Sequence, residues 1–510
     1  MIYRIKPNAW FFICFILVAA SLGLFQHFTH GPLSVHQGAQ SDRACVAWNY
    51  YTQSMDFLQP RVSENRAHEG VTGMEFPIIQ YIVALLYKLF GFHDFFYRAV
   101  MFLIVFFGVF AAFKISGFFI QKTLPRLLLT MGWFLSPILV FYSNSYIPDT
   151  AALAFSMIAI HQFIKFYFRI NQRKSALWYV LFITLAGLIK VTFLIPHIAI
   201  IAFVFLPFVF PKFIESQHRS EKLPWYTIIL PFAAAIAWYM YASHLTKSTG
   251  NNHFLQQINP ARSLKEFIDN IAFATNTWQS SLYAKWPFIL LLVFGFSKIF
   301  TSLKTQPLIS YFVVFLSLGF LSFVVLFSGQ LRYHDYYLTA MYPLIFFLLL
   351  QHQQLYVEGK TLFAGIAPLV AVILFYSFPF FAWSNAYNML HARYEKGNYF
   401  YQPALAESEF YSSDLRHKID SIIPPSQEII SVFDPTPNTT LYALKRRGVR
   451  IANDFTPALT DQVILNSKIQ YMVLNDSMRW ENQYRKNMHF DQQLLLRSGI
   501  ISVWKILPQK

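Results

Sequence analysis

The sequence predicts a polytopic α-helical membrane protein that ends in a small C-terminal α/β soluble domain. Hydrophobic residues make up 55% of the 510 residues, and charged residues make up only 13%. Apolar runs of about 18 to 20 residues recur along most of the chain, as transmembrane helices require. These runs end near residue 383, and charged residues then become more frequent. We therefore expect residues 1–383 to form the membrane domain and residues 384–510 the soluble one.

About eleven apolar runs are candidate spans by the twenty-residue rule. They are Trp10–Phe28, Phe95–Phe113, Leu127–Ser143, Thr150–Phe168, Leu177–Lys190, Val191–Val209, Pro224–Ser243, Trp286–Phe300, Pro307–Phe327, Leu338–Gln351 and Leu362–Trp383. One further segment, Pro77–Gly91, is apolar but short, because a helix of that length covers only ~22 Å of a ~30 Å hydrocarbon core. We expect it to lie in the outer interface as an amphipathic helix.

The distribution of basic residues predicts the side of each loop. If Pro77–Gly91 does not cross the membrane and the N-terminus is inside, the basic loops face the cytoplasm, as the positive-inside bias favours. These loops are Lys114–Arg126, Arg169–Lys174, Lys212–Lys222, Lys298–Lys304 and the stretch near Lys360. The same bias accounts for the net charge of +16, so no nucleic-acid partner is expected. The first loop, residues 28–94, and the C-terminal domain then lie outside the inner (cytoplasmic) membrane.

The C-terminal residues alternate between strand-like and helix-like patterns, which indicates a small α/β domain. The predicted strands are Ile429–Phe433, Arg450–Asn453, Tyr471–Asn475 and Ile500–Leu507, and the predicted helices are Thr439–Arg447 and Leu459–Ser467. No catalytic motif stands out in this region. Asn438-Thr-Thr matches the glycosylation acceptor pattern, but such tripeptides are common by chance.

Two aspartates, Asp42 and Asp149, lie on the outer side by this topology and can share one site. A carboxylate at the water–membrane boundary can act as a general base on a substrate hydroxyl, and two carboxylates can bind a divalent cation. Each aspartate also suits a structural role. Ser41 or Asp42 can cap a short helix through Ala44–Thr52, and Asp149 can open a helix after Pro148. The residue types alone leave these alternatives open, and they do not decide whether a metal is needed.

The same topology places further cations and aromatic residues on the outer side of the membrane. Lys190 lies between two spans with almost no loop, so close to hydrocarbon that an anionic partner such as a lipid phosphate is expected. Its alternative is an amine that reaches the lipid headgroups. In the turn Arg332–Tyr337, Arg332 and His334 can donate to phosphate oxygens. The alternative for this turn is an aromatic belt with an internal Arg332–Asp335 pair.

Three short motifs, in this order, resemble the membrane-embedded glycosyltransferases of the GT-C class. They are an outward loop with an early aspartate, Asp42, a Pro-led interfacial helix ending Leu-Tyr-Lys-Leu-Phe-Gly, and a Tyr-x-x-x-x-x-Pro-Asp sequence that opens a later span at Asp149. The similarity covers roughly Trp10–Leu350. It is nearest to family 39, the protein O-mannosyltransferase and aminoarabinose-transferase-like bacterial proteins.

The resemblance implies an inverting hexosyl- or pentosyltransferase that moves a sugar from a polyprenyl-phosphate donor to a glycan, lipid or protein acceptor on the outer face. It implies that Asp42 and Asp149 are catalytic, with Asp42 as general base or acceptor orienter. The implied donor-phosphate residues are Lys190, Arg332, His334 and Tyr337, and the implied residues of the acceptor or donor pocket are Arg43, Glu75 and Asp335. No cofactor is certain, although Asp42 and Asp149 permit a divalent cation.

The chain departs from the aminoarabinose-transferring members in one motif. They commonly have Glu-Lys-Pro before the interfacial helix, whereas this chain has Glu75-Phe76-Pro77. We therefore expect a sugar other than aminoarabinose and an acceptor other than lipid A.

A lipid-linked oligosaccharide polymerase or flippase is the alternative function. Flippases usually need charged residues in the centres of their spans, and these spans have almost none. A receptor whose tail binds a partner also stays open.

Overall fold

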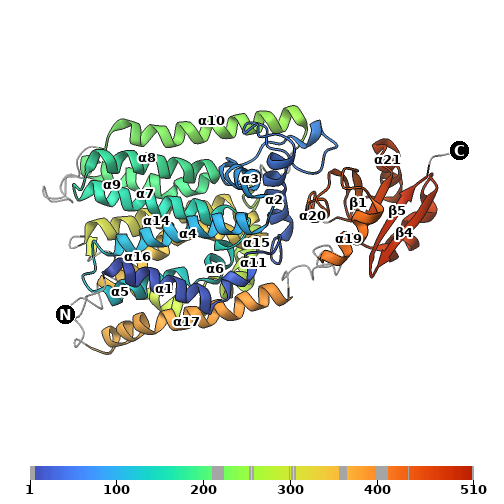
Figure 1. Ribbon diagram of the computed structural model, residues 1–510. Coiled ribbons are helices and arrows are strands. Elements are labelled where there is room, and N and C mark those ends of the chain that lie inside the picture. The colour runs from blue at the N-terminus through green and yellow to red at the C-terminus, as the bar shows by residue number, and fades with distance from the viewer. Residues whose placement is uncertain are drawn as a thin grey trace.

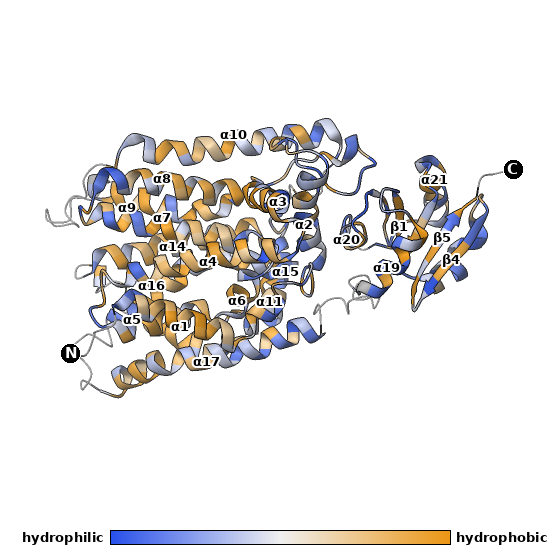
Figure 2. Ribbon diagram, in the orientation of Figure 1, coloured by the Kyte–Doolittle hydropathy of each residue, from blue (hydrophilic) through white to orange (hydrophobic). Residues whose placement is uncertain are grey.

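The computed structural model describes residues 6–209, 223–251, 254, 258–297, 299, 302–303, 306–354, 365–396, 412–434 and 436–507. These residues form a bundle of helices with a small α/β domain at one end (Figure 1). Apolar residues dominate the bundle, whereas the C-terminal domain mixes apolar and hydrophilic residues (Figure 2). The prediction of a mainly helical protein with a small C-terminal sheet is confirmed.

The bundle is built from helices of very different lengths. They are α1 (Pro7–Ser21), α2 (Gln37–Thr52), α3 (Ile78–Phe90), α4 (Phe95–Ser116), α5 (Thr123–Phe134), α6 (Pro137–Ser143), α7 (Asp149–Tyr167), α8 (Gln172–Ile189), α9 (Ile195–Val209), α10 (Trp225–Thr249), α11 (Leu264–Leu282), α12 (Lys285–Ser297), α14 (Pro307–Leu326), α15 (Ser328–Tyr333), α16 (Tyr342–His352) and α17 (Ile366–Lys396). Short 3-10 turns connect some of them: η1 (Leu24–His27), η2 (His68–Gly70), η3 (Val191–Leu194) and η5 (Asp335–Met341).

Within the described ranges, four helices are long and apolar enough to cross a membrane, namely α4, α10, α14 and most of α17. The count rises to six if two bent pairs each form one span, α5 with α6 at 78° and α11 with α12 at 98°. Other predicted runs are divided: Gly23, with a φ of 70°, separates α1 from η1, and Pro137 starts a new helix after α5. A multi-pass architecture is supported, and the total of about eleven spans stays a prediction.

The short segment Pro77–Gly91 folds as α3, a helix of 13 residues. One face is buried through Ile79, Val83 and Tyr87, while Leu89 and Phe90 are exposed. The segment is therefore a helix, as expected, and its position in the outer interface stays a prediction.

The C-terminal domain contains a five-stranded sheet in the order β2-β1-β3-β5-β4. The strands are β1 (Ile429–Val432), β2 (Gly448–Ile451), β3 (Tyr471–Leu474), β4 (Gln492–Ser498) and β5 (Ile501–Ile506). β1 pairs in parallel with β2 and β3, and β5 pairs antiparallel with β3 and β4. The helices of the domain are α19 (Ser413–Ile422), α20 (Thr439–Ala443), α21 (Pro457–Ser467) and the short α22 (Ser477–Arg479).

Each of the four predicted strands overlaps an observed strand, but β4 was not predicted. Its sequence Gln-Gln-Leu-Leu-Leu-Arg-Ser lacks the apolar–polar alternation that marks a half-buried strand. The predicted helix Thr439–Arg447 ends early, at Ala443, because Lys445 has a φ of 54°, outside the helical region. The predicted domain boundary at residue 383 lies inside α17, which continues to Lys396.

The C-terminal domain docks on α2 and on the first loop through close backbone contacts. Gly38 of α2 faces Thr436, and a Cβ atom at Gly38 would overlap the Thr436 side chain. Gly448 opens β2 with a φ of 152°, a conformation that favours glycine. Its N–H donates to Ser63 O at 3.1 Å, and its carbonyl accepts from Asn65 N at 2.9 Å. The first loop therefore continues the edge of the sheet.

The first loop also reaches the domain through Asp94, just before α4. Its Oδ1 accepts a hydrogen bond from Tyr146 of the membrane domain at 2.9 Å and another from Tyr442 of α20 at 2.6 Å. Lys445 lies 4.3 Å from the ring centroid of Phe92. These partly buried contacts hold α20 against the end of the bundle.

We expect Gly38→Val to weaken this docking, because the added side chain collides with Thr436. Overpacking of this kind costs about 1–3 kcal/mol. Hydrogen exchange at the amides of Asn65 and Gly448, which bond across the interface, should become faster. Thr52→Val, an exposed position on the same helix, is the matched control. Unchanged protection at both amides in the Gly38 variant would contradict the docking described.

Candidate active site at the end of the bundle

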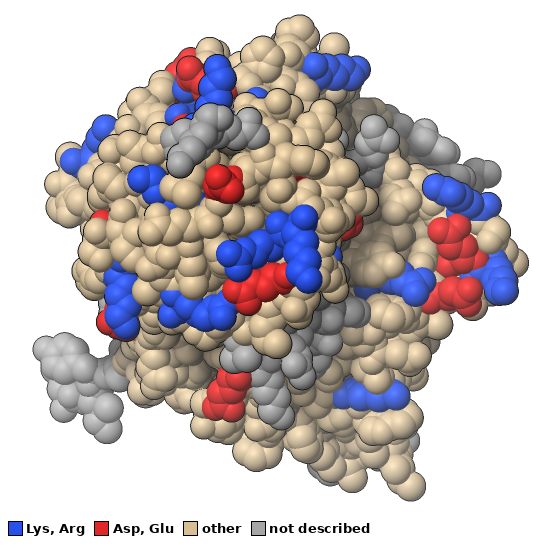
Figure 3. All heavy atoms as spheres, turned by 90° about the vertical axis from the view of Figure 1, so that its right-hand side faces the viewer, with Lys and Arg blue, Asp and Glu red and all other residues tan. Residues whose placement is uncertain are grey.

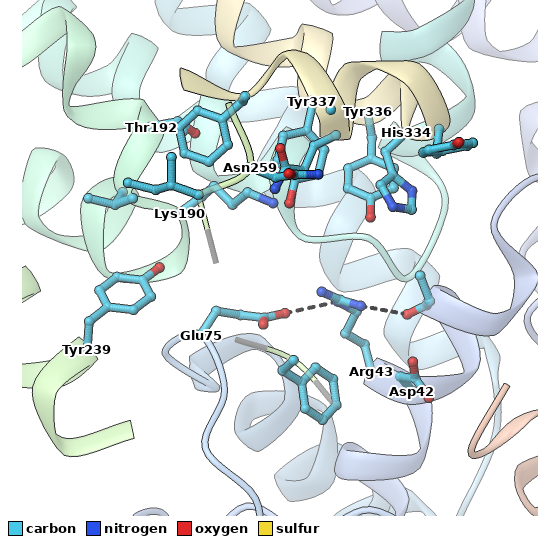
Figure 4. Close-up of a pocket in the computed structure, with 18 of the residues that line it drawn as sticks. Asp42, Arg43, Glu75, Lys190, Thr192, Tyr239, Asn259, His334, Tyr336 and Tyr337 are labelled. Carbon is cyan, nitrogen blue, oxygen red and sulfur yellow. Dashed lines mark hydrogen bonds and ion pairs between the residues drawn. The ribbon is translucent and has the colours of Figure 1, made fainter. Parts of the chain in front are cut away.

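A cavity of about 1060 Å³ opens at the end of the bundle that carries the C-terminal domain. Residues from distant parts of the chain point into it (Figure 4). Its polar lining comes from α2, the loop before α3, the break after α8, α10 and the α15–η5 segment: Asp42, Arg43, Glu75, Lys190, Thr192, Tyr239, Ser243, Thr246, Lys247, Asn259, Gln330, His334, Tyr336 and Tyr337. Four of these charged residues, Asp42, Arg43, Glu75 and Lys190, were candidates from the sequence.

Asp42 lies in the second turn of α2, which begins at Gln37, so it is not the N-cap of that helix. The capping alternative is therefore wrong. Its side chain lines the cavity but is only 9% exposed. Asn438 of the C-terminal domain donates from Nδ2 to Asp42 Oδ1 at 2.7 Å. The carboxylate thus lies where the cavity meets the docked domain.

Asp149 is the first residue of α7 and follows Pro148, as the helix-start interpretation expected. It is 2% exposed and does not line the cavity. Its Oδ1 lies 3.2 Å from Lys190 Nζ, and its Oδ2 has no hydrogen-bond partner among the described residues. Asp149 therefore reaches the cavity through Lys190 and not directly.

Lys190 occupies the break between α8 and η3, with extended backbone. Its Nζ lies 4.1 Å from the ring centroid of Tyr337 and 5.4 Å from that of Tyr336. A carboxylate and two aromatic faces are suitable partners for an ammonium group that is mostly out of water. The Phe76 N–H donates to Leu188 O at 3.1 Å, which fastens the loop before α3 to the end of α8.

Arg43 and Glu75 form a second pair across the cavity (Figure 4), with 2.9 Å between Nε and Oε1. Arg43 Nη1 also donates to Ala39 O, one turn earlier in α2, at 3.0 Å. Burial alone lowers the pKa of Arg43, but the Glu75 carboxylate and further groups including Asp42 raise it above its usual value. Arg43 is therefore a permanent cation beside Asp42.

His334 lines the cavity, but its charge differs from the expectation of a cation for phosphate. Burial, with contributions from His36 and Lys190, lowers the pKa of His334 to about 3. Its Nδ1 has no hydrogen-bond partner in the part of the chain that the structure describes. A neutral imidazole with an unused nitrogen can still donate or accept one hydrogen bond from a ligand.

Arg332 and Asp335 lie outside the cavity, and the Arg332–Asp335 pair of the alternative interpretation is not made. Arg332 Nη1 donates to Asn270 Oδ1 at 3.2 Å, and its guanidinium lies 4.7 Å from the ring centroid of Phe273. Asp335 is fully buried and is paired with Arg393 of α17. This explains why Asp335 does not pair with Arg332: a carboxylate without contact with water needs a cation at hydrogen-bond distance, and Arg393 is that cation.

Asp335 fixes the segment that carries His334 and Tyr337. It accepts from Tyr142 Oη at 2.6 Å and lies 3.2 Å from His36 Nε2. Burial alone raises the pKa of Asp335, but Arg393 and His36 lower it well below its usual value. This carboxylate is therefore ionised at neutral pH and anchors the turn from behind.

The polar residues of α10 were not among those predicted from the sequence. Tyr239, Ser243, Thr246 and Lys247 line the cavity. Their spacing of four, three and one residues puts them on one helical face, and this stripe was the signal that could have identified them.

Asn438 was noted only for its tripeptide pattern. Its side chain is completely buried, which removes it from glycosylation in the folded protein.

The residues present do not fit a metal ion. No group of three or more His, Cys, Asp or Glu side chains suited to a metal occurs within the described ranges. Asp149 is paired with Lys190, and Asp42 accepts a hydrogen bond from an amide. A divalent cation prefers several oxygen ligands at once, so this arrangement does not favour the divalent cation that the sequence left open at Asp42 and Asp149.

We expect His334 to stay neutral in the empty cavity between pH 5 and 8. Nitrogen NMR of histidine-labelled protein measures this, and His334→Gln assigns the signal. Because the pKa of His334 in the folded protein, about 3, lies below the ordinary histidine pKa of 6.5, protonation favours the unfolded state. The contribution of His334 to stability should therefore be lost as the pH falls from about 6.5 towards 3, and His334→Gln should remove that slope. A charged imidazole at pH 6 would contradict this.

No protein-family model and no curated protein sequence matches the chain. Solved structures do match it. ArnT from Cupriavidus metallidurans bound to undecaprenyl phosphate has a TM-score of 0.64 at 9% identity, over 98% of both chains. ArnT in the apo state has a TM-score of 0.61 at 11% identity, again over 98% of both chains. The archaeal oligosaccharyltransferase AglB from Archaeoglobus fulgidus, in complex with an inhibitory peptide and a dolichol-phosphate, has a TM-score of 0.52 at 13% identity, over 93% of this chain and 70% of that chain.

At such low identities the likeness concerns the fold. ArnT and AglB are both membrane glycosyltransferases of the GT-C class. The fold expected from the three motifs is therefore confirmed, while the glycosyltransferase activity and family 39 stay predictions. The chain therefore has the fold of the GT-C membrane glycosyltransferases.

Proposed function

We propose that this protein is an inverting glycosyltransferase that uses a polyprenyl-phosphate-linked sugar as donor. The observation that carries the proposal is the cavity that joins the buried carboxylate of Asp42 to the cations Arg43 and Lys190. Such a site combines a base for an acceptor hydroxyl with positive charge for a phosphate. The GT-C fold of the chain supports the same reaction class.

The proposed reaction breaks the bond between the anomeric carbon and the phosphate oxygen of the donor. An acceptor hydroxyl attacks that carbon from the opposite face, so the configuration inverts, and Asp42 takes the hydroxyl proton. The bond electrons stay with the polyprenyl phosphate, whose negative charge Lys190 and Arg43 can stabilise. Asp149 acts through Lys190, by holding its ammonium group at 3.2 Å.

The lipid part of the donor is proposed to leave the cavity beside α10. Tyr239, Ser243 and Lys247 line the cavity and also a shallow hollow together with Ile236 and Met240. Ile236 and Met240 are exposed apolar residues of a candidate span. A polyprenyl chain can lie along such a surface while its phosphate stays at Lys190.

The residue at position 76 favours a sugar and acceptor other than aminoarabinose and lipid A. In place of a lysine, Phe76 packs edge-to-face on Trp238 with ring centroids 4.9 Å apart. It also contacts Phe57 at 5.0 Å. This position therefore adds aromatic packing to the loop before α3 and no charge to the cavity.

The proposed site faces outward from the inner membrane. The loops after α4 and after α7 meet at the opposite end of the bundle, where the rings of Phe118 and Phe168 stack at 5.3 Å. These loops are among the basic ones expected in the cytoplasm. Seen from the end with the C-terminal domain, the surface carries both basic and acidic residues (Figure 3). A mixed, hydrated surface of this kind suits an extracytoplasmic domain.

We expect Asp42→Asn to reduce transfer by at least about 100-fold, because the amide cannot accept the hydroxyl proton. Purified protein is incubated with a panel of polyprenyl-phosphate hexoses and pentoses and candidate acceptors, and release of polyprenyl phosphate is measured. Asp56→Asn, an exposed residue of the first loop, is the matched control. Near-normal transfer by the Asp42 variant would overturn the assignment of the base.

We expect Lys190→Met to weaken binding of undecaprenyl phosphate roughly 10- to 100-fold, the effect of losing one charge-assisted hydrogen bond. Binding is measured by titration in lipid nanodiscs. Lys285→Met removes an exposed lysine outside the cavity and should leave the dissociation constant unchanged. Equal affinity in the Lys190 variant and the unmodified protein would contradict the phosphate site. Product length then separates the proposed single-sugar transfer from a polymerase.

A further inference from the structure

We propose that Asn438 of the C-terminal domain is a positioning residue for the Asp42 carboxylate. The inference rests on the proposed function and extends it, because it makes the soluble domain a part of the active site. The C-terminal domain then holds the base in its working orientation.

Both ends of the Asn438 amide are engaged, which fixes its direction. Its Oδ1 accepts from the N–H groups of Ser63 and Glu64, at 3.0 and 3.1 Å. Backbone N–H groups can only donate, so the oxygen must face them. The NH2 group is then directed to Asp42 Oδ1, at 2.7 Å. The first loop thus orients the amide, and the amide orients the carboxylate.

The backbone around Asn438 is held as firmly as its side chain. The Asn438 carbonyl accepts from Tyr442 N at 2.8 Å within α20. Asp434, just after β1, accepts from Thr440 N at 3.0 Å and from Ser431 Oγ at 2.9 Å. The turn between β1 and α20 is therefore fastened to both elements, and Asn438 cannot shift without disturbing them.

A hydrogen bond from a neutral amide favours the ionised form of a carboxylate and fixes its plane. A general base needs both, because it must be deprotonated and must point to the hydroxyl that it activates. The other charge close to Asp42 on its own helix is Arg43, which is already paired with Glu75. Asn438 supplies a directed hydrogen bond to the carboxylate.

The test is Asn438→Asp, which keeps the size of the side chain and an oxygen for Ser63 and Glu64. It replaces the NH2 donor by a second carboxylate oxygen facing Asp42. Two carboxylates at hydrogen-bond distance cannot both ionise easily, so the pair should hold a proton to higher pH. We expect kcat at pH 7 to fall roughly 10- to 100-fold and the acidic limb of the pH–rate profile to move up by about one unit or more.

Donor binding separates positioning from general damage. The dissociation constant of undecaprenyl phosphate should stay within about twofold, because Lys190 and its partners are unchanged. Arg447→Ala is the matched control: it removes the hydrogen bond from Arg447 Nη2 to Glu69 O, another contact of 2.8 Å between the domain and the first loop that does not involve Asp42. This control should leave kcat and the pH profile unaltered.

The outcomes distinguish the two proposals. If Asp42→Asn is inactive but Asn438→Asp keeps the normal kcat and pH profile, the positioning role is wrong and the proposed function stands. If Asn438→Asp and Arg447→Ala lower kcat equally with no shift of the acidic limb, Asn438 only helps docking and the positioning role is again wrong. If Asp42→Asn is active, or no donor of the panel is used, the proposed function itself fails.

Discussion

The pairing of buried charges at one end of an apolar bundle is the constraint on which the cavity depends. Lys190 is paired with Asp149, and Arg43 with Glu75. A charge that leaves water without a partner costs several kcal/mol, so the elements that carry these charges must meet. This requirement brings α2, the loop before α3, α7 and the break after α8 to one place. Asp335 and Arg393, outside the cavity, are likewise a pair of buried opposite charges, and they join η5 to the long helix α17.

Much of the fold could be predicted because the apolar patterns that mark helices and strands are local in sequence. The helical class, the soluble end and the overlapping strands of the sheet follow from hydropathy and turn residues. The predicted spans were less accurate, since the predominantly apolar run Leu127–Ser143 bends by 78° between α5 and α6. Apolar composition does not record where a helix breaks. β4 was missed for the related reason that three adjacent leucines carry no strand period.

The part of the candidate site that could be predicted consists of charged residues next to apolar segments, where a charge without a partner is costly. Asp42, Arg43, Glu75 and Lys190 are polar groups near apolar segments, and all four line the cavity. Arg332 and Asp335 showed the same signal, but their partners come from α11 and α17, which no local pattern reveals. Asn438 lies 396 residues from the aspartate it contacts, so only the folded chain identifies it.

The bridge between Glu64 and Gly448 has a consequence for biogenesis. β2 is an edge strand, and an uncovered edge invites pairing with other chains. Here the first loop, made early in synthesis, pairs with the start of that edge at Gly448, while the strand itself is made late. The last part of the polypeptide thus completes its sheet on a template that is already in place. A chain whose first loop stays on the wrong side of the membrane leaves the edge of β2 open to other chains, so correct insertion also protects the protein from aggregation.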